Sequence, residues 1–124
     1  MLTALTKVAI IDDDPSIRKA LVRVLSSAHY SLSAFGSADD FLLTLNGNNP
    51  ECILADYQLP NMTGLDLYAQ LHRRGYHIPT IIISAHDAMA LRKACLKAGI
   101  VAFVAKPFSR EVLLQSVKFA LRSR

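Results

Sequence analysis

The chain has 124 residues, the usual size of one domain, and 52% of them are hydrophobic, enough to build a sizeable core. Together with this hydrophobic content, a charged fraction of 19% excludes an intrinsically disordered chain. The net charge of +4 comes from scattered lysines and arginines rather than a basic run, which argues against direct binding of nucleic acid by this chain.

Targeting and redox signals point to the cytoplasm. No apolar stretch approaches the roughly 18 residues of a membrane span. Residues 1–6 lack the basic and apolar regions of a signal peptide. Cys52 and Cys95 match no metal-ligand spacing and suit a reducing interior. We therefore expect a cytoplasmic protein.

The first predicted unit begins with the apolar run at residues 7–11, which is typical of a strand. Asp14 is the expected N-cap of the following helix, and Pro15 stands at the first helical position, where its missing N–H costs nothing. One stripe of this helix should face the core: Ile17, Ala20, Leu21, Val24 and Leu25.

The second unit starts at residues 31–35, where alternating side chains predict a half-exposed edge strand. Ser37, followed three residues later by Asp40, resembles a capping box and should begin a short helix. Its apolar side is expected to consist of Phe41, Leu42 and Leu45. The turn-forming residues at 46–50 should end it.

The third unit is organised around an aspartate. Residues 52–56 form a short apolar run that ends abruptly in Asp56. A continuous apolar run is typical of a strand that is covered on both faces. A loop at 57–64 and a helix at about 65–73 should follow, with Leu67, Tyr68 and Leu71 facing inward.

Two further strands are predicted, at residues 80–83 and 101–105. Between them, a weakly amphipathic, alanine-rich helix at about 88–98 should end at Gly99. Ser109 should cap a last helix. Its inward face is expected to consist of Val112, Leu113, Val117, Ala120 and Leu121.

The alternation of five strands with five helices predicts an α/β fold with a parallel sheet and helices on both faces. Right-handed crossovers restrict the topology to doubly wound forms. There is no internal repeat or linker, so we expect a single domain over residues 1–124 with a core at about 7–121.

Polar side chains stand where four of the predicted strands end. Asp12 and Asp13 follow the first strand, Asp56 ends the third, Ser84 follows the fourth and Lys106 the fifth. In open α/β sheets, ligands bind at these carboxyl ends. Clustered acids repel each other unless a cation is present, and an all-oxygen ligand set favours Mg²⁺ over zinc. A carboxylate nucleophile, a cation, a lysine and a hydroxyl together indicate phosphoryl transfer.

Five sequence motifs occur in order between about residues 7 and 121. They are Ile11-Asp12-Asp13-Asp14, the stretch from Asp56 to Gly64, Ser84-Ala85, Lys97-Ala98-Gly99 and Lys106-Pro107-Phe108. Together they resemble the receiver domains of response regulators in bacterial two-component systems, and are most similar to the nitrogen-fixation regulator type. The resemblance implies a flavodoxin-like three-layer fold with a five-stranded sheet of order 2-1-3-4-5, and a cis peptide between Lys106 and Pro107.

The resemblance also implies roles for individual residues. Asp56 would accept a phosphoryl group. Mg²⁺ would be held by Asp12, Asp13, Asp56 and the carbonyl of Gln58. The phosphoryl group would be contacted by Ser84, Ala85 and Lys106, and the conformational switch would consist of Ser84 and Phe103.

The partners implied by the resemblance are a sensor histidine kinase as phosphoryl donor and an output that controls transcription. The domain would catalyse only its own phosphorylation and dephosphorylation. Its output would pass through the face formed by the helix at 88–98, the strand at 101–105 and the last helix. That face would support a homodimer or act on a C-terminal DNA-binding domain outside this chain.

Two other interpretations remain. The run from Asp12 to Ser16 also fits the D-x-D-x-[ST] pattern of Mg²⁺-dependent aspartate-nucleophile phosphatases, with Asp12 as nucleophile and Asp14 as acid/base. Such enzymes need a later acidic pair, whereas no acid follows Lys106 until Glu111. A phosphorylation-independent interaction domain is the third interpretation, and the complete set of site residues argues against it.

Overall fold

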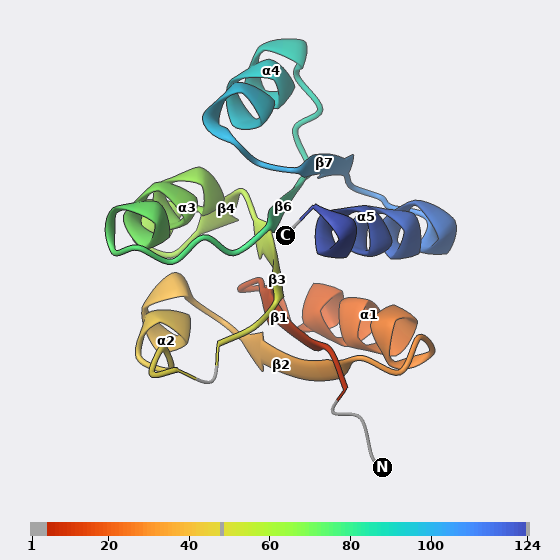
Figure 1. Ribbon diagram of the computed structural model, residues 1–124. Coiled ribbons are helices and arrows are strands. Elements are labelled where there is room, and N and C mark those ends of the chain that lie inside the picture. Colours follow the sequence, from red (N-terminus) through yellow and green to blue (C-terminus); the bar gives the residue numbers. More distant parts are fainter. Residues whose placement is uncertain (1–4, 48, 124) are drawn as a thin grey trace.

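The computed structural model describes residues 5–47 and 49–123, so the N-terminal residues 1–4 considered above, and Asn48 in the predicted turn, lie outside the described part. Five strands form one parallel sheet in the order β2-β1-β3-β6-β7 (Figure 1). Their bounds are Lys7–Ile11 for β1, Ser31–Phe35 for β2, Cys52–Asp56 for β3, Thr80–Ser84 for β6 and Ala102–Ala105 for β7. This is the predicted 2-1-3-4-5 order, because two short additional strands lie between β3 and β6 in the chain.

Five helices cover the sheet, as predicted. They are α1 (Pro15–Ser26), α2 (Ala38–Leu42), α3 (Gly64–Arg73), α4 (Met89–Ala98) and α5 (Arg110–Arg122). Figure 1 shows α1 and α5 on one face of the sheet, α2 and α3 on the other, and α4 beside the edge strand β7. The flavodoxin-like three-layer fold is therefore confirmed. Among the described residues, no helix is both long and apolar enough to cross a membrane.

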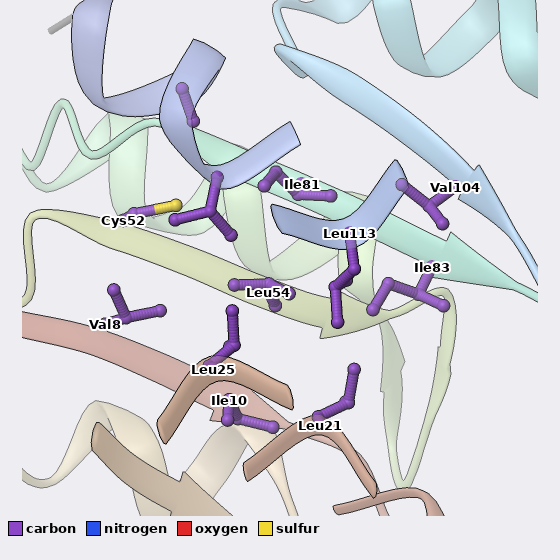
Figure 2. Close-up of a cluster of buried hydrophobic side chains, with 12 residues drawn as sticks. Val8, Ile10, Leu21, Leu25, Cys52, Leu54, Ile81, Ile83, Val104 and Leu113 are labelled. Carbon is purple, nitrogen blue, oxygen red and sulfur yellow. The ribbon is translucent and has the colours of Figure 1, made fainter. Parts of the chain in front are cut away.

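The core consists of two apolar clusters separated by the sheet. The cluster beneath α1 and α5 includes Leu21, Leu54 and Leu113, which point toward one another in Figure 2. The cluster on the opposite face is formed around Phe41 and Leu67. Residues of β1, β3 and β6 are buried on both faces, which explains why these strands read as continuous apolar runs.

Side-chain caps fix where most helices begin, and the predicted ones are present. The carboxylate of Asp14 accepts hydrogen bonds from the N–H groups of Ser16 and Ile17, and Pro15 opens α1. Ser37 and Ser109 cap α2 and α5 in the same way. Helix α4 differs, because its N-cap residue Ala88 has no side chain that could accept such a bond. Its N-terminus is therefore less firmly fixed.

Three local details differ from the sequence-based expectations. The predicted loop at 57–64 contains a small antiparallel hairpin of β4 (Gln58–Leu59) and β5 (Met62–Thr63). Helix α2 already ends at Leu42, well before the turn residues that were expected to end it. Val112 was expected to face the core but is 49% exposed, because α5 packs through Leu113, Val117 and Ala120 instead.

Candidate functional site

The strand ends bring the predicted site residues to one edge of the sheet. In the pairing of β3 with β6, Asp56 lies opposite Ile83, and in the pairing of β6 with β7, Ser84 lies opposite Ala105. Lys106 follows directly after β7, and Asp12 directly after β1. Because all these strands are parallel, their last residues meet at the same carboxyl edge.

Both the backbone and the side chain of Asp12 are fixed by hydrogen bonds. It is fully buried, and its N–H donates to the carbonyl of Phe35 at 3.0 Å, which continues the pairing of β1 with β2. One carboxylate oxygen accepts from the Asp14 N–H at 2.9 Å and the other from Lys106 Nζ at 3.2 Å. Its carbonyl oxygen accepts from Arg18 Nη1 at 2.7 Å. A buried carboxylate with these partners is a fixed element of the site.

Lys106 bridges two carboxylates. Its Nζ lies 3.2 Å from an oxygen of Asp12 and 3.2 Å from an oxygen of Asp56, and its side chain is 16% exposed. Burial by itself lowers the pKa of Lys106, but the charges and hydrogen bonds of Asp12 and Asp56 outweigh that effect and raise it. The ammonium group is therefore charged at neutral pH and placed among the carboxylates.

Asp56 lies in an environment that opposes its charge. Burial raises the pKa of this carboxyl group, and the nearby charge of Asp12 raises it further. The ammonium of Lys106 and the N–H of Gln58, 3.4 Å from Asp56 Oδ1, act in the opposite direction without cancelling the rise. A bound cation would relieve this repulsion.

The acids are arranged for such a cation. Asp12, Asp13 and Asp56 each offer a carboxylate oxygen, and these three atoms lie within 4.8 Å of one another. The formal charges of these three carboxylates and of the Lys106 ammonium sum to −2, which a divalent ion balances. Hard oxygen ligands are those that Mg²⁺ prefers. The donor set thus fits Mg²⁺.

Ser84 lies at the site edge with its hydroxyl engaged elsewhere. It is buried, and its Oγ accepts from the His86 N–H at 3.0 Å and donates to the His86 carbonyl oxygen at 3.2 Å. Its own carbonyl accepts from the Lys106 N–H at 2.8 Å, which ties the ends of β6 and β7 together. The hydroxyl must break its hydrogen bonds with His86 before it can donate to a group bound on Asp56.

Phe103 is held by a residue that the sequence did not single out. The ring is 7% exposed and belongs to the core cluster on the α2–α3 face. The Arg92 guanidinium lies over it, 4.9 Å from the ring centroid, and donates to the Phe103 carbonyl at 3.3 Å. The same guanidinium pairs with Asp87 at 2.9 Å. Arg92 therefore links α4, β7 and the loop after Ser84.

Gly64 was part of a quoted motif, but its structural role was not predicted. A Cβ on this residue would lie 2.6 Å from the Asp56 carbonyl oxygen and 2.7 Å from Ile82 Cδ1. The Gly64 N–H donates to the Tyr57 carbonyl at 2.7 Å. The N-terminus of α3 thus approaches the end of β3 closely. The sequence feature that could have indicated this close approach is a glycine directly after the cap residue Thr63.

The structure gives Asp12 and Asp14 positions unsuited to the phosphatase interpretation. Asp12 is fully buried with both carboxylate oxygens bonded, which is a poor position for a nucleophile. Asp14 accepts bonds from Ser16 and Ile17 as the cap of α1 rather than standing free as an acid/base. The cis peptide expected between Lys106 and Pro107 is present.

Comparisons with known proteins agree with this geometry. Residues 8–118 match the family described as "Response regulator receiver domain". The response regulator protein TodT of Pseudomonas putida is 38% identical over 113 residues, which cover 91% of this chain and 50% of TodT. The transcriptional regulatory protein DctD of Rhizobium meliloti, named for C4-dicarboxylate transport, is 30% identical over 99% of this chain and 27% of its own length.

The fold is likewise that of solved receivers. The crystal structure titled FixJ-N superposes with a TM-score of 0.88 and 27% identity, covering 98% of each chain. This chain spans about half the length of the curated relative TodT and about a quarter of DctD.

Proposed function

The chain belongs to the response regulator receiver domain family, and from this we propose that it transmits a signal by accepting a phosphoryl group on Asp56. The phosphatase interpretation is not favoured by this membership or by the positions of Asp12 and Asp14. We further propose that residues 1–124 form one domain with a core at about 7–121, that the protein is cytoplasmic and that its phosphoryl donor is a sensor histidine kinase.

One observation carries the assignment of Asp56. Its carboxylate shares the Lys106 ammonium with the buried Asp12, at 3.2 Å from each, while Asp13 offers a third oxygen nearby. Asp12 is enclosed, whereas Asp56 is only partly buried and ends a strand whose neighbours supply the remaining groups. Of the two acids that share the Lys106 ammonium, Asp56 is thus the one that a phosphoryl donor can reach.

In the proposed reaction, a carboxylate oxygen of Asp56 attacks the phosphorus of a phosphohistidine. The P–N bond breaks, its electron pair stays on the ring nitrogen, and the imidazole leaves neutral because its other nitrogen carries a proton. Asp56 becomes an acyl phosphate. Lys106 then turns its charge to the phosphoryl oxygens, which Ser84 and the N–H of Ala85 also contact. The protein contributes positioning and charge neutralisation, which supply most of the catalysis in phosphoryl transfer.

Mg²⁺ would be held directly by Asp13, Asp56 and the Gln58 carbonyl, with Asp12 acting through water. When bound, it would offset the charge that the phosphoryl group brings to the cluster. Beyond this self-modification we propose no further enzymatic activity.

The metal requirement can be tested apart from the site of phosphorylation. We expect acetyl phosphate to phosphorylate the protein in the presence of Mg²⁺ but not of EDTA. Mg²⁺ should bind Asp13→Ala more weakly than wild type, by about tenfold or more, because the variant lacks a carboxylate that would contact the metal directly. Mg²⁺ titration followed by amide chemical shifts measures the binding. Equal affinities for Asp13→Ala and wild type would place the metal elsewhere.

The proposed output surface is the face formed by α4, β7 and α5. Large apolar side chains remain exposed on both helices: Leu96 is 46% exposed, Val112 49% and Phe119 53%. Helix α4 buries only Cys95 fully, so little holds it in place. We assign to this face a homodimer contact or a contact with a C-terminal DNA-binding domain of a longer protein, with transcription as the output.

The switch would run from Ser84 to Phe103. If the Ser84 hydroxyl turns to the phosphoryl group, its two bonds with His86 are lost and the loop that leads to Asp87 is released. Asp87 pairs with Arg92, which covers the Phe103 ring. A shift at Ser84 therefore reaches the α4–β7–α5 face through contacts already present.

A further inference from the structure

Arg18 lies at the site without belonging to any of its predicted roles. It is the fourth residue of α1, at the end of the first turn, and its side chain reaches back to the end of β1, where Nη1 donates to the Asp12 carbonyl oxygen at 2.7 Å. This is a short hydrogen bond from a charged donor, the stronger kind in proteins. The side chain is half-buried. It is the contact by which α1 reaches the Asp12 carbonyl.

The carbonyl that accepts from Arg18 belongs to the peptide bond between Asp12 and Asp13. The Asp12 carbonyl and the Asp13 N–H belong to one planar unit, so fixing the direction of the carbonyl also fixes where the Asp13 backbone leaves it. On its other side, Asp12 is held by the bond from its N–H to Phe35. Arg18 thus sets the start of the Asp13 side chain, which is exposed and offers an oxygen to the cluster.

Gly36 leaves the room that the guanidinium occupies. A Cβ on Gly36 would lie 3.3 Å from Arg18 Nη1 and 3.9 Å from its Cζ. At this distance the guanidinium would have to move by a few tenths of an ångström, which would strain its hydrogen bond to the Asp12 carbonyl. Gly36 follows directly after Phe35, whose carbonyl accepts from the Asp12 N–H, so the end of β2 lies beside both Asp12 and the guanidinium of Arg18.

We propose that Arg18 is a positioning residue for the Mg²⁺ site, and that Gly36 leaves the space in which its guanidinium lies. The proposal rests on the proposed function of the Asp12–Asp13–Asp56 cluster. Arg18 acts through the Asp12–Asp13 peptide and does not contact the metal or the phosphoryl group. Loss of an outer partner of a metal ligand typically weakens metal binding by about 10-fold or more.

Two effects of removing Arg18 have opposite signs, which makes the test decisive. The guanidinium is a positive charge near a cation site, so its loss would tighten Mg²⁺ binding if charge alone mattered. Its loss would weaken binding if it positions Asp13. At about 0.15 M salt the Debye length is about 8 Å, so the contribution of distant charges is reduced.

The experiment titrates Mg²⁺ into the whole domain at that salt concentration and follows the amide resonances of Asp13 and Asp14. Arg23→Ala is the matched control, because it removes an equal charge from the same helix about 7.5 Å further along the axis, at an exposed position. We expect Arg18→Ala to bind Mg²⁺ about tenfold more weakly, Arg18→Lys to restore part of the loss, and Arg23→Ala to stay within about twofold of wild type.

A second measurement is made on the metal-free protein. In the metal-free protein, the Asp13 amide resonance should shift in Arg18→Ala and not in Arg23→Ala. Mg²⁺ affinity of Arg18→Ala equal to or tighter than wild type would overturn the proposal, as would equal losses in both variants.

A second variant covers the case in which Arg18→Ala does not fold. Gly36→Ala keeps Arg18 but crowds its guanidinium, and should weaken Mg²⁺ binding severalfold; unchanged affinity would overturn the proposal. Asp13→Ala distinguishes an error in the proposed metal site from an error in the proposed role of Arg18. Tight Mg²⁺ binding by Asp13→Ala would show that the metal site itself is wrong, whereas weak binding by Asp13→Ala with normal binding by Arg18→Ala would overturn only the role of Arg18.

Discussion

The carboxylate of Asp56 is kept at a site that disfavours its negative charge. Its pKa is raised by burial and by Asp12 above the ordinary value of an aspartate, 3.8. The folded protein therefore binds this proton more tightly than the unfolded chain does. Ionised Asp56 lowers the stability at neutral pH, and this penalty disappears as the pH falls through the raised pKa toward 3.8.

It follows that Asp56→Asn should stabilise the metal-free protein. We expect a melting temperature about a few degrees above wild type at pH 7 in EDTA, with the difference shrinking as the pH approaches 4. It should also shrink on addition of Mg²⁺, which binds wild type more tightly than a variant that lacks the Asp56 carboxylate. Thermal unfolding followed by circular dichroism measures this. Asp40→Asn, at an exposed acid outside the cluster, should give no such gain. A melting temperature of Asp56→Asn at or below wild type would contradict this view of the site.

Single residues also mark the limit of sequence reasoning. Asp12, Asp13, Asp56 and Lys106 could be found because each ends or follows an apolar run, and strand ends meet by geometry. Arg18 and Arg92 could not, because an arginine on an amphipathic helix is expected to be a solvated charge. Each donates to a backbone carbonyl, of Asp12 and of Phe103 respectively, and a carbonyl group is the same in every sequence. The contacts of Arg92 with Asp87 and with the Phe103 ring also depend on the fold.

At the scale of elements, strands and caps were predictable because their signals are local. Val112 was placed wrongly because five apolar residues on α5 span a wider arc than the stripe that packs. The β4–β5 hairpin depends on the turn at Asn61, where φ is 70°. No pattern of apolar residues predicts this hairpin. The exact strand order came from the resemblance to receivers, since handedness alone allows more than one doubly wound sheet.

The approach of α3 to β3 gives a test at this scale. By helix propensity alone, Gly64→Ala should stabilise the protein by up to about 1 kcal/mol. Because the new methyl group would meet the Asp56 carbonyl and Ile82, we expect a loss of about 1–3 kcal/mol instead. Urea unfolding measures the change. A stability equal to or above that of wild type would show that α3 does not pack as closely as described.

At the scale of the whole molecule, the site and the proposed output face are connected by one short route. Ser84, the loop to Asp87, Arg92 and Phe103 lie in sequence or in contact with one another. Helices α1 and α5, by contrast, pack through buried stripes on the large cluster shown in Figure 2. A disturbance at Asp56 should thus spread toward α4 and β7 rather than through that cluster.

We therefore expect a phosphoryl mimic to change amide chemical shifts and hydrogen exchange mainly between Ser84 and Val117. Beryllium fluoride with Mg²⁺ serves as the mimic, and Asp56→Asn as the control that should not respond. A response confined to α1 and α2 would contradict the proposed α4–β7–α5 output face.

Whether Asp56 itself carries the phosphoryl group is decided by the intact mass of the protein after incubation with acetyl phosphate and Mg²⁺. Wild type should gain the mass of one phosphoryl group, Asp12→Asn should gain it slowly, and Asp56→Asn should gain none. A phosphoryl adduct on Asp56→Asn, or an adduct lost only in Asp12→Asn, would contradict the account.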